Sequence, residues 1–347
     1  MMGIPSHPTG GLKVVLEYAN YLAKSGFEVH IVYSATLNFQ QEPFINKLRL
    51  VLRYPYVHVR GFSAKVWFGL EKSVKEHWTF SLNQRHVPKT DFYVATARQT
   101  SIYLKDYDVP EENKLYLIQG FENWDVTDRD VYDTYRFGLK NIVVSNWLKD
   151  KVEKSGANCV LIKNGFDFNY FRLNSPIESR SSCTISMLYH KSELKGCKYG
   201  LKALSLVRAQ KPQLKGLLFG TEGKPEDLPE WIEYYCCPDR ATLNYIYNTS
   251  SIYVAPSLQE GWGLTVGEAM ICGNAIVCTD TLGFQEMVTD GKEGIIVPTR
   301  NSQALANAIL AFIDNPELRV SMAQAAVNTI QNFKWDTSFR LFESMLK

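Results

Sequence analysis

Short β-rich runs and amphipathic helical stretches alternate along this chain, and the alternation occurs twice. The β-rich runs include "EVHIVYS", "DFYVATA" and "NIVVS" in the first half and "CTISMLY", "LKGLLFG", "SIYVAPS" and "AIVCTD" in the second. In the helical stretch that opens at Gly10, apolar residues recur with helical spacing at Leu12, Val15, Leu16, Ala19 and Leu22. Strand–helix alternation favours a parallel sheet with helices on both faces. The sequence therefore predicts an α/β protein with two Rossmann-like parallel-sheet domains.

A polar stretch from Asn164 to Ser182 separates the two alternating runs and is the best candidate for a linker. We predict an N-terminal domain over residues 1–165, a C-terminal domain over 166–330 and a C-terminal helix over 331–347. The length of 347 residues also favours two domains over one core. Only "MMGIPS" precedes the stretch "HPTGG", so the first strand is expected to be short or missing. Ligands of two such sheets are expected in a cleft at the carboxyl ends of the strands.

Charge and composition exclude several functional classes. The formal net charge is +2 and 45% of the residues are hydrophobic, which indicates a globular protein without the basic field of a nucleic-acid binder. No apolar run approaches the ~18 residues of a membrane span, and no basic segment followed by an apolar stretch marks a secretion signal. The seven cysteines and six histidines lack disulfide-framework or metal-ligand spacing. Reduced thiols, no metal site and a cytoplasmic location are therefore expected.

Two loops carry residues suited to phosphate binding. Gly10 and Gly11 open a helix, whose free backbone amides bind phosphate well, although Gly-Gly before a helix is often only a turn. Lys191 and Lys195 follow the β-rich run "CTISML", where a lysine could neutralise a diphosphate. The alternative for both lysines is an ordinary solvated surface position.

The stretch "SLQEGWGLTVGEAM" places two acids on either side of a glycine-rich turn. Glu260 lies at the carboxyl end of the run "SIYVAPS", and Glu268 lies one turn into the following helix. Carboxylates at this position can accept hydrogen bonds from the vicinal hydroxyls of a sugar. The alternative is structural: Thr265 and Glu268 fit a capping box, in which Thr265 caps the helix and Glu268 reaches back to the cap amide.

This stretch resembles the E-x7-E signature of retaining glycosyltransferases of family 4, which have the GT-B fold. Further segments are similar to that family in the expected order: "PTGGLKVVLEYANYLAKSGFEVHIVYS", "VVSNWLKDKV", "LIKNGFDFNYF" and the region through "GKEGIIVP". The similarity is strong from Ser250 to Pro298 and weak from Ala35 to Leu115. The resemblance implies two facing Rossmann-like domains and a C-terminal helix that packs back on the N-terminal domain.

The resemblance also implies a role for each matching residue. Glu268 would bind the ribose hydroxyls, Glu260 would contact the donor sugar near the reacting centre, and Lys195 would bind the diphosphate, so that Glu260 and Lys195 are the catalytic candidates. The remaining donor-binding candidates are Gly10 and Gly11 near the distal phosphate and the backbone of Gly261, Trp262, Gly263, Leu264 and Thr265. This chain departs from the family in two places: His190 stands where an arginine is usual, with Lys191 beside it, and Gln119 and Glu122 stand where an N-domain histidine is frequent. We assign Gln119 and Glu122 to the acceptor side.

The expected activity is transfer of a sugar from a nucleoside-diphosphate sugar to an acceptor hydroxyl, with retention, in polysaccharide or glycan biosynthesis. The acceptor would be a glycan or a lipid-linked glycan, and the family resemblance implies that neither a metal nor another cofactor is needed. Two alternatives stay open. One is a GT-B sugar-nucleotide epimerase or hydrolase, and the other is a non-catalytic sugar-nucleotide-binding subunit of a glycan assembly complex.

The segment from Asn46 to Trp78 suggests a contact with the inner face of a membrane. It combines two acids with seven basic residues, namely Lys47, Arg49, Arg53, Arg60, Lys65, Lys72 and Lys75, and aromatic residues are interleaved among them. A basic, aromatic surface can dock on anionic lipid. The alternative is an ordinary strand and a solvated helix.

Overall fold

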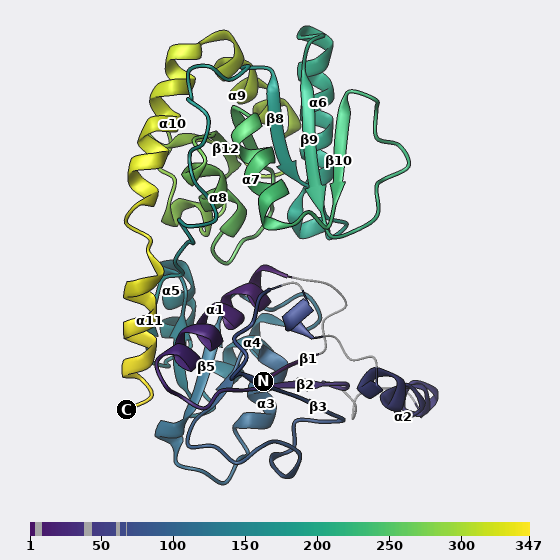
Figure 1. Cartoon of the computed structure of the whole chain (residues 1–347), viewed down its shortest axis with the longest axis vertical. Coiled ribbons are helices and arrows are strands. Elements are labelled where there is room, and N and C mark those ends of the chain that lie inside the picture. The colour runs from purple at the N-terminus through teal and green to yellow at the C-terminus, as the bar shows by residue number, and fades with distance from the viewer. Residues whose placement is uncertain (4–8, 38–43, 60–62, 67) are drawn as a thin grey trace. The chain divides into compact units, whose positions relative to one another are not determined.

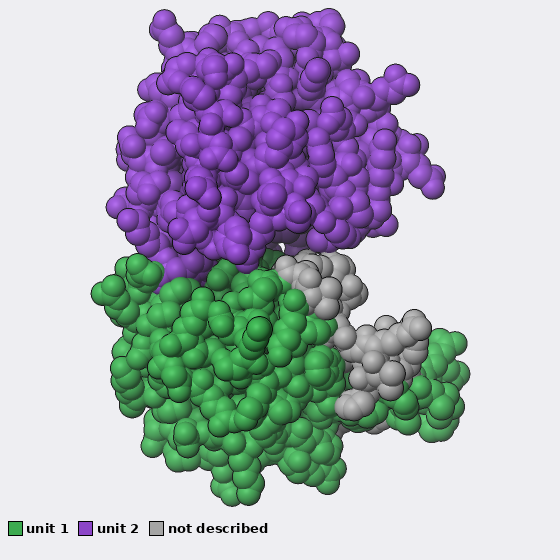
Figure 2. Space-filling model, viewed as in Figure 1, with its two compact units in different colours: residues 1–164, 336–347 green, residues 165–335 purple. Residues whose placement is uncertain are grey.

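The computed structural model describes residues 1–3, 9–37, 44–59, 63–66 and 68–347. These residues form two compact units (Figure 2): unit 1 comprises Met1–Asn164 with Asp336–Lys347, and unit 2 comprises Gly165–Trp335. In both units the strands of the described residues pair in parallel. The predicted α/β class with two parallel-sheet domains is therefore confirmed.

Unit 1 contains two sets of paired strands. The first set has the order β1-β2-β3 and the second the order β4-β5-β6-β7. Their bounds are β1 (Met2–Gly3), β2 (His30–Ser34), β3 (Lys75–Thr79), β4 (Tyr93–Ala95), β5 (Lys114–Ile118), β6 (Lys140–Val143) and β7 (Cys159–Leu161). Met1 links the two sets, because its amino group donates to the carbonyl of Val94 (2.9 Å) and its carbonyl accepts from the Thr96 hydroxyl (2.7 Å). The first strand is short, with two residues that pair with β2.

The helices of unit 1 include the one predicted at Gly10. Their bounds are α1 (Gly10–Lys24), α2 (Phe44–Val59), α3 (Arg98–Leu104), α4 (Asp128–Tyr135), α5 (Asn146–Lys154) and α11 (Trp335–Ser344). Leu16 of α1 is fully buried against Ile31 and Tyr33 of β2. Helix α11 packs on α1, as the resemblance implied (Figure 1). The ring of Tyr21 stacks on Phe339 with 4.5 Å between centroids, and its hydroxyl donates to Glu343 (2.7 Å).

Unit 2 holds a six-stranded sheet with the order β10-β9-β8-β11-β12-β13. The strands are β8 (Thr184–Leu188), β9 (Lys215–Gly220), β10 (Ile232–Cys236), β11 (Ile252–Ala255), β12 (Ala275–Thr279) and β13 (Gly294–Val297). The helices are α6 (Cys197–Gln210), α7 (Arg240–Thr249), α8 (Leu264–Ile271), α9 (Ser302–Asp314) and α10 (Pro316–Ile330). The sequence reading missed β10 and β13. The chain order of the strands reverses direction between β8 and β11, which is the switch point of a doubly wound sheet.

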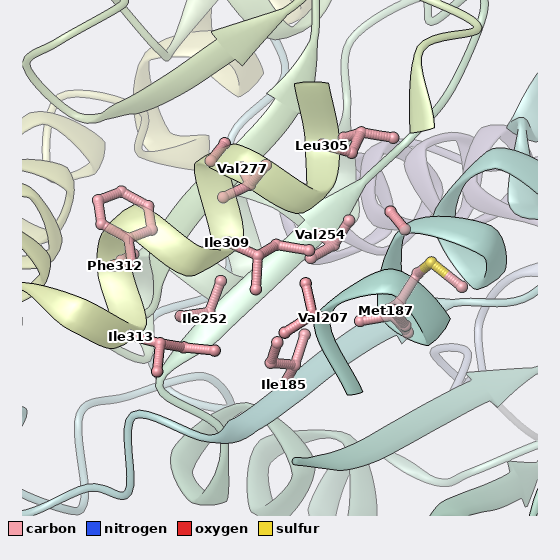
Figure 3. Close-up of a cluster of buried hydrophobic side chains, with 14 of the residues drawn as sticks. Ile185, Met187, Val207, Ile252, Val254, Val277, Leu305, Ile309, Phe312 and Ile313 are labelled. Atoms are coloured by element: carbon pink, nitrogen blue, oxygen red, sulfur yellow. The ribbon is translucent and has the colours of Figure 1, made fainter. Parts of the chain in front are cut away.

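The core of unit 2 explains why its strands are the clearest in the sequence. Ile185, Val254 and Val277 project from three neighbouring strands toward α6 and α9, where Val207 and Ile309 meet them (Figure 3). All five side chains are fully buried. Because helices cover such a sheet, its central strands read as continuous apolar runs. This core fixes the strand ends from which the candidate site residues extend.

Candidate functional site

Two loops leave the sheet of unit 2 at its switch point, one after β8 and one after β11. They touch each other, because the amide of Leu258 donates to the carbonyl of Leu194 (2.7 Å). Gly196 makes this approach feasible, since a Cβ added there would lie 2.0 Å from the carbonyl oxygen of Pro256, and its φ of 60° is left-handed. Ligands of open α/β sheets bind at this position in the fold.

Lys195 and Glu260 form an ion pair across the two loops. The distance from Nζ of Lys195 to Oε1 of Glu260 is 2.6 Å, and the Ser257 hydroxyl donates to the same oxygen (2.9 Å). The Glu260 side chain is 13% exposed and that of Lys195 is 31% exposed, so both remain reachable from solvent. The carbonyl of Ser257 in turn accepts a hydrogen bond from Thr279 at the end of β12. Residues 65 positions apart in the sequence therefore present one cation and one anion at the switch point.

Glu268 is buried in the first turns of α8. Its Oε2 accepts a hydrogen bond from the hydroxyl of Tyr247 (3.2 Å), which α7 presents. Burial raises the pKa of Tyr247 well above its ordinary value, and the negative charge of Glu268 adds to this effect. The same two causes, burial being the larger, raise the pKa of the Cys272 thiol to about 12. Glu268 is thus held rigidly against α7, a contact that the sequence reading did not anticipate.

The capping-box interpretation of Thr265 and Glu268 is wrong. Helix α8 begins at Leu264, its N-cap is Gly263, and no side chain caps it. The cause is the close packing of this turn: Gly263 has a φ of 99°, and a Cβ there would lie 2.7 Å from the Phe284 ring. A glycine cap leaves the first amides of α8 without a side-chain partner from the cap residue, which suits them to a ligand.

The five candidates from Gly261 to Thr265 follow Glu260 directly and run into the first turn of α8, which begins at Leu264. Trp262 turns its side chain inward: it is 3% exposed, and its ring lies 5.6 Å from that of Phe333. Its side chain is therefore turned away from solvent, and only its backbone stays a donor-binding candidate. The inward ring anchors the turn that carries the candidate amides.

His190 and Lys191 share a carboxylate that the sequence reading missed. Glu222, in the loop after β9, lies 3.7 Å from Nε2 of His190 and 3.7 Å from Nζ of Lys191, and it accepts from the Lys191 amide (3.3 Å). The amide of Ser192 donates to Nδ1 of His190 (2.9 Å), so the proton of a neutral ring lies on Nε2, toward Glu222. The sequence held a signal for this contact, because an acid two residues after the run "LKGLLFG" reaches the same edge of a parallel sheet.

In unit 1, Gly10 and Gly11 open α1, and Gln119 lies beside them. Thr9 caps the helix by accepting from the amide of Leu12 (3.2 Å), and Nε2 of Gln119 donates to the carbonyl of Gly11 (3.2 Å). A Cβ at Gly11 would have only ordinary contacts with Gln119, the nearest at 3.5 Å. Most of the preceding loop, "IPSHP", lies outside the described residues.

Glu122 occupies a different environment from Gln119, although both follow β5. It is buried, accepts from the Arg98 amide (2.8 Å), and burial raises its pKa to about 7. The guanidinium of Arg98 itself pairs with Asp125 (2.9 Å). The two acceptor-side candidates are therefore an amide bonded to the α1 turn and a buried acid at the start of α3.

The described residues hold neither a candidate metal site nor a candidate membrane-spanning helix. No group of three or more His, Cys, Asp and Glu side chains among them is placed to hold a metal ion. None of their helices combines the length and apolar character that a bilayer crossing requires.

Comparison with known proteins concentrates on unit 2. Residues 180–315 match the model of a family described as glycosyl transferases group 1. The phosphatidyl-myo-inositol mannosyltransferase of Mycolicibacterium smegmatis is 27% identical over 196 residues, which are 53% of this chain and 50% of that protein. The lipopolysaccharide core biosynthesis mannosyltransferase LpsB of Rhizobium meliloti is 31% identical over 132 residues, 36% of this chain and 33% of that protein. The matched segment thus spans half or less of these curated relatives.

Two solved structures resemble the chain over nearly its whole length. Anabaena Alr3699/HepE, in complex with UDP and glucose, aligns with a TM-score of 0.75 and 16% identity over 99% of this chain and 98% of that one. The sucrose-phosphate synthase of Thermosynechococcus elongatus aligns with a TM-score of 0.68 and 17% identity over 97% and 93%. At these identities the likeness concerns the fold.

Proposed function

We propose that this chain, which has the GT-B fold and whose residues 180–315 match the glycosyl transferases group 1 family, transfers a sugar from a nucleoside-diphosphate sugar to an acceptor hydroxyl with retention. The match over residues 180–315 agrees with the family resemblance read from the sequence. The observation that carries the proposed activity is the Lys195–Glu260 pair at the switch point of unit 2, inside the matched segment. We place the reaction in glycan or polysaccharide biosynthesis.

Lys195 is proposed to stabilise the leaving group. Negative charge develops on the diphosphate as the glycosidic bond breaks, and fixed positive charge in a poorly hydrated site lowers the energy of that state. On donor binding, Lys195 exchanges the Glu260 carboxylate for phosphate oxygens, and Glu260 becomes available to a hydroxyl of the sugar. The amides from Gly261 to Thr265 add oriented dipoles to the same region.

Glu268 is proposed to bind the ribose diol, and Gly10 and Gly11 are proposed to approach the distal phosphate. The hydrogen bond from the Tyr247 hydroxyl orients the Glu268 carboxylate at this position. Gln119 and Glu122 remain the acceptor-side candidates. We propose a phosphate oxygen of the leaving diphosphate as the base. Because protein groups supply the positive charge, the reaction is proposed to need no metal ion.

The comparisons guide the choice of donors for a first test. UDP and glucose are bound to one structural neighbour, and two relatives are named mannosyltransferases. A panel of nucleoside-diphosphate hexoses that includes UDP-glucose and mannosyl donors should contain one that raises the melting temperature, since a ligand of the native state stabilises it. Nuclear magnetic resonance of the product then tests retention at the anomeric carbon.

The same assay separates the proposal from its alternatives. Transfer to a glycan or lipid-linked acceptor supports a transferase, whereas epimerised or free sugar released without acceptor indicates an epimerase or a hydrolase. Donor binding without turnover on any acceptor indicates a non-catalytic binding subunit.

Substitution of the two acids tests their assignment. We expect Glu268→Gln to weaken donor binding and Glu260→Gln to lower turnover more than donor affinity, each by roughly 1–3 kcal/mol, because a charged hydrogen bond is lost. Isothermal titration and initial rates measure the two effects. Glu226→Gln, at an exposed position of unit 2, is the matched control. Wild-type affinity and turnover in both variants would remove the acids from the site.

We also propose that α2 contacts an anionic membrane surface. Phe44, Leu48 and Leu52 fall on one side of this helix, and Phe44 and Leu52 are 81% and 70% exposed. At helical spacing, Lys47 and Arg49 flank this apolar side on either edge. Tyr54, seven residues after Lys47 and so on the same edge of the helix, packs its ring edge-on against Phe80 at 5.5 Å. Apolar residues between basic ones are the pattern of a helix that lies in the plane of an anionic interface. In Figure 1, α2 stands apart from the strands of its unit.

Vesicle flotation at low salt tests this contact. We expect binding to vesicles with anionic lipid, weaker binding to zwitterionic vesicles, and a loss of roughly ten-fold or more in Leu48→Glu and Leu52→Glu, because each buried leucine contributes about 1.5–3 kcal/mol. Leu341→Glu changes an exposed leucine of α11 in the same unit and should bind as the wild type does. Equal binding by the α2 variants and the wild type would contradict the proposal.

A further inference from the structure

Two adjacent cysteines lie at the end of β10 in unit 2: Cys236 is its last residue and Cys237 follows it. Cys236 and Cys237 are both exposed, and their sulfur atoms lie 3.8 Å apart. All seven cysteines, each of them in the described part of the chain, are free thiols, and the other five are buried or half-buried. Cys237 has a φ of 47°, a left-handed conformation that strains a residue other than glycine. The strained backbone holds the two thiols side by side.

These thiols contact the loop that carries Glu222. The amide of Cys237 donates to the carbonyl of Gly220 (2.7 Å), and its thiol donates to the carbonyl of Thr221 (3.3 Å). On the same strand, the hydroxyl of Tyr234 donates to the carbonyl of Glu222 (2.5 Å). The backbone position of Glu222, and with it the pairing of Glu222 to His190 and Lys191, therefore depends on the end of β10.

We propose that Cys236 and Cys237 form a reversible modification site, at which a small-molecule disulfide converts the two thiols into a vicinal disulfide that displaces the Glu222 loop. Adjacent Cα atoms lie about 3.8 Å apart, less than the about 4.4–6.8 Å of an ordinary disulfide. Such a bond is strained and easily reduced, which is typical of regulatory rather than structural disulfides. The effect on the donor rests on the proposed function, whereas formation of the disulfide does not.

The reaction proceeds by two exchange steps. The thiolate of Cys236 attacks one sulfur of the small disulfide, and the first small thiolate leaves and takes up a proton. The thiol of Cys237 then loses its proton and attacks the Cys236 sulfur of the mixed disulfide, which releases the second small thiol. Two cysteine thiols are oxidised, and one small disulfide is reduced to two thiols. The Cys237 thiol donates to the Thr221 carbonyl and partial burial of its sulfur raises its pKa, so Cys236 is assigned as the first nucleophile.

Disulfide formation alters the contacts of the loop. The sulfur atoms must close from 3.8 Å to about 2.05 Å, and Cys237 loses the hydrogen that it donates to Thr221. The backbone of Cys237 must rotate to bring the two sulfur atoms together. Because the Cys237 amide is hydrogen-bonded to the carbonyl of Gly220, this rotation displaces the Gly220–Glu222 turn. His190 and Lys191 then lose a fixed carboxylate partner.

Mass spectrometry of the full chain with oxidised glutathione tests the site. We expect an intact mass lower by two hydrogens, located in the peptide with Cys236 and Cys237 and reversed by dithiothreitol. Cys159→Ser, which changes a half-buried cysteine of unit 1, should still form the disulfide. Cys236→Ser and Cys237→Ser should not. Persistent glutathionylation of the wild type, a disulfide-linked dimer or no reaction would overturn the proposal.

Amide hydrogen exchange tests the displacement without any donor. In the oxidised protein we expect at least a five-fold faster exchange in residues 189–192 and 220–223 and unchanged exchange in α9. Unchanged exchange around Glu222 would contradict the displacement of the loop but not the formation of the disulfide. With a donor identified, oxidation should weaken its binding in the wild type and not in Cys237→Ser. A protein that binds no donor in either state contradicts the proposed function and not the modification site.

Discussion

Replacement of Lys195 by alanine should lower donor turnover by roughly ten-fold to a hundred-fold, the cost of removing one charge stabiliser from a transition state. The variant should also bind the nucleoside diphosphate more weakly, while its affinity for the bare nucleoside is unchanged, because Lys195 is proposed to contact only the diphosphate. Initial rates at saturating donor and titration with both ligands measure these effects.

The partner of Lys195 supplies the internal control for this experiment. In Lys195→Ala the Glu260 carboxylate keeps the hydrogen bond from the Ser257 hydroxyl but loses the ion pair with the Lys195 ammonium group. Its negative charge then repels the diphosphate. The double variant Lys195→Ala/Glu260→Gln should therefore recover part of the lost diphosphate affinity, but not the turnover. Lys198→Ala removes an exposed lysine paired with Glu193 and should behave as the wild type. If the variant lost affinity equally for the nucleoside and the nucleoside diphosphate, Lys195 would affect binding by supporting the structure of the site and not by contacting the diphosphate.

The sheet of unit 2 could be predicted because its central strands are buried on both faces. The runs around Ile185 and Val254 contain few polar residues, so their periodicity and length were informative. β10 and β13 are the two edge strands: in β10 only Ile232 is buried and the other residues are half-buried or exposed, and in β13 the two middle residues are half-buried. Neither edge strand is buried throughout as the central strands are, so neither is marked by a fully buried apolar run.

The site was predictable where the parallel-sheet rule applies and not where tertiary contacts decide. Lys195 and Glu260 follow strands whose carboxyl ends share one edge, so their proximity follows from the topology. The contact of Tyr247 with Glu268 depends on how α7 packs beside α8, which no local pattern encodes. The wrong prediction for the cap of α8 has the same origin. A glycine is needed at position 263 because a Cβ there would clash with the Phe284 ring, which a local capping pattern does not reveal.

The close approach of the two site loops predicts a large effect at Gly196. In Gly196→Ala the added Cβ would lie 2.0 Å from the Pro256 carbonyl oxygen, and the alanine would have to adopt a φ of 60°. We expect a loss of roughly 2–5 kcal/mol in the free energy of unfolding of unit 2, from left-handed strain and overpacking together. The melting temperature of that unit should fall by roughly 5–20 °C, as calorimetry measures it.

Gly223 provides the matched control for this substitution. A Cβ there meets no atom within 4 Å, so Gly223→Ala should leave stability unchanged or raise it slightly through the unfolded state. A folded Gly196→Ala protein should also bind donor more weakly, because Lys195 is the preceding residue and the clash pushes its loop away from Glu260. Wild-type stability in Gly196→Ala would mean that the loops yield without cost, and the ion pair between Lys195 and Glu260 would then be too loosely held to serve as a preorganised site.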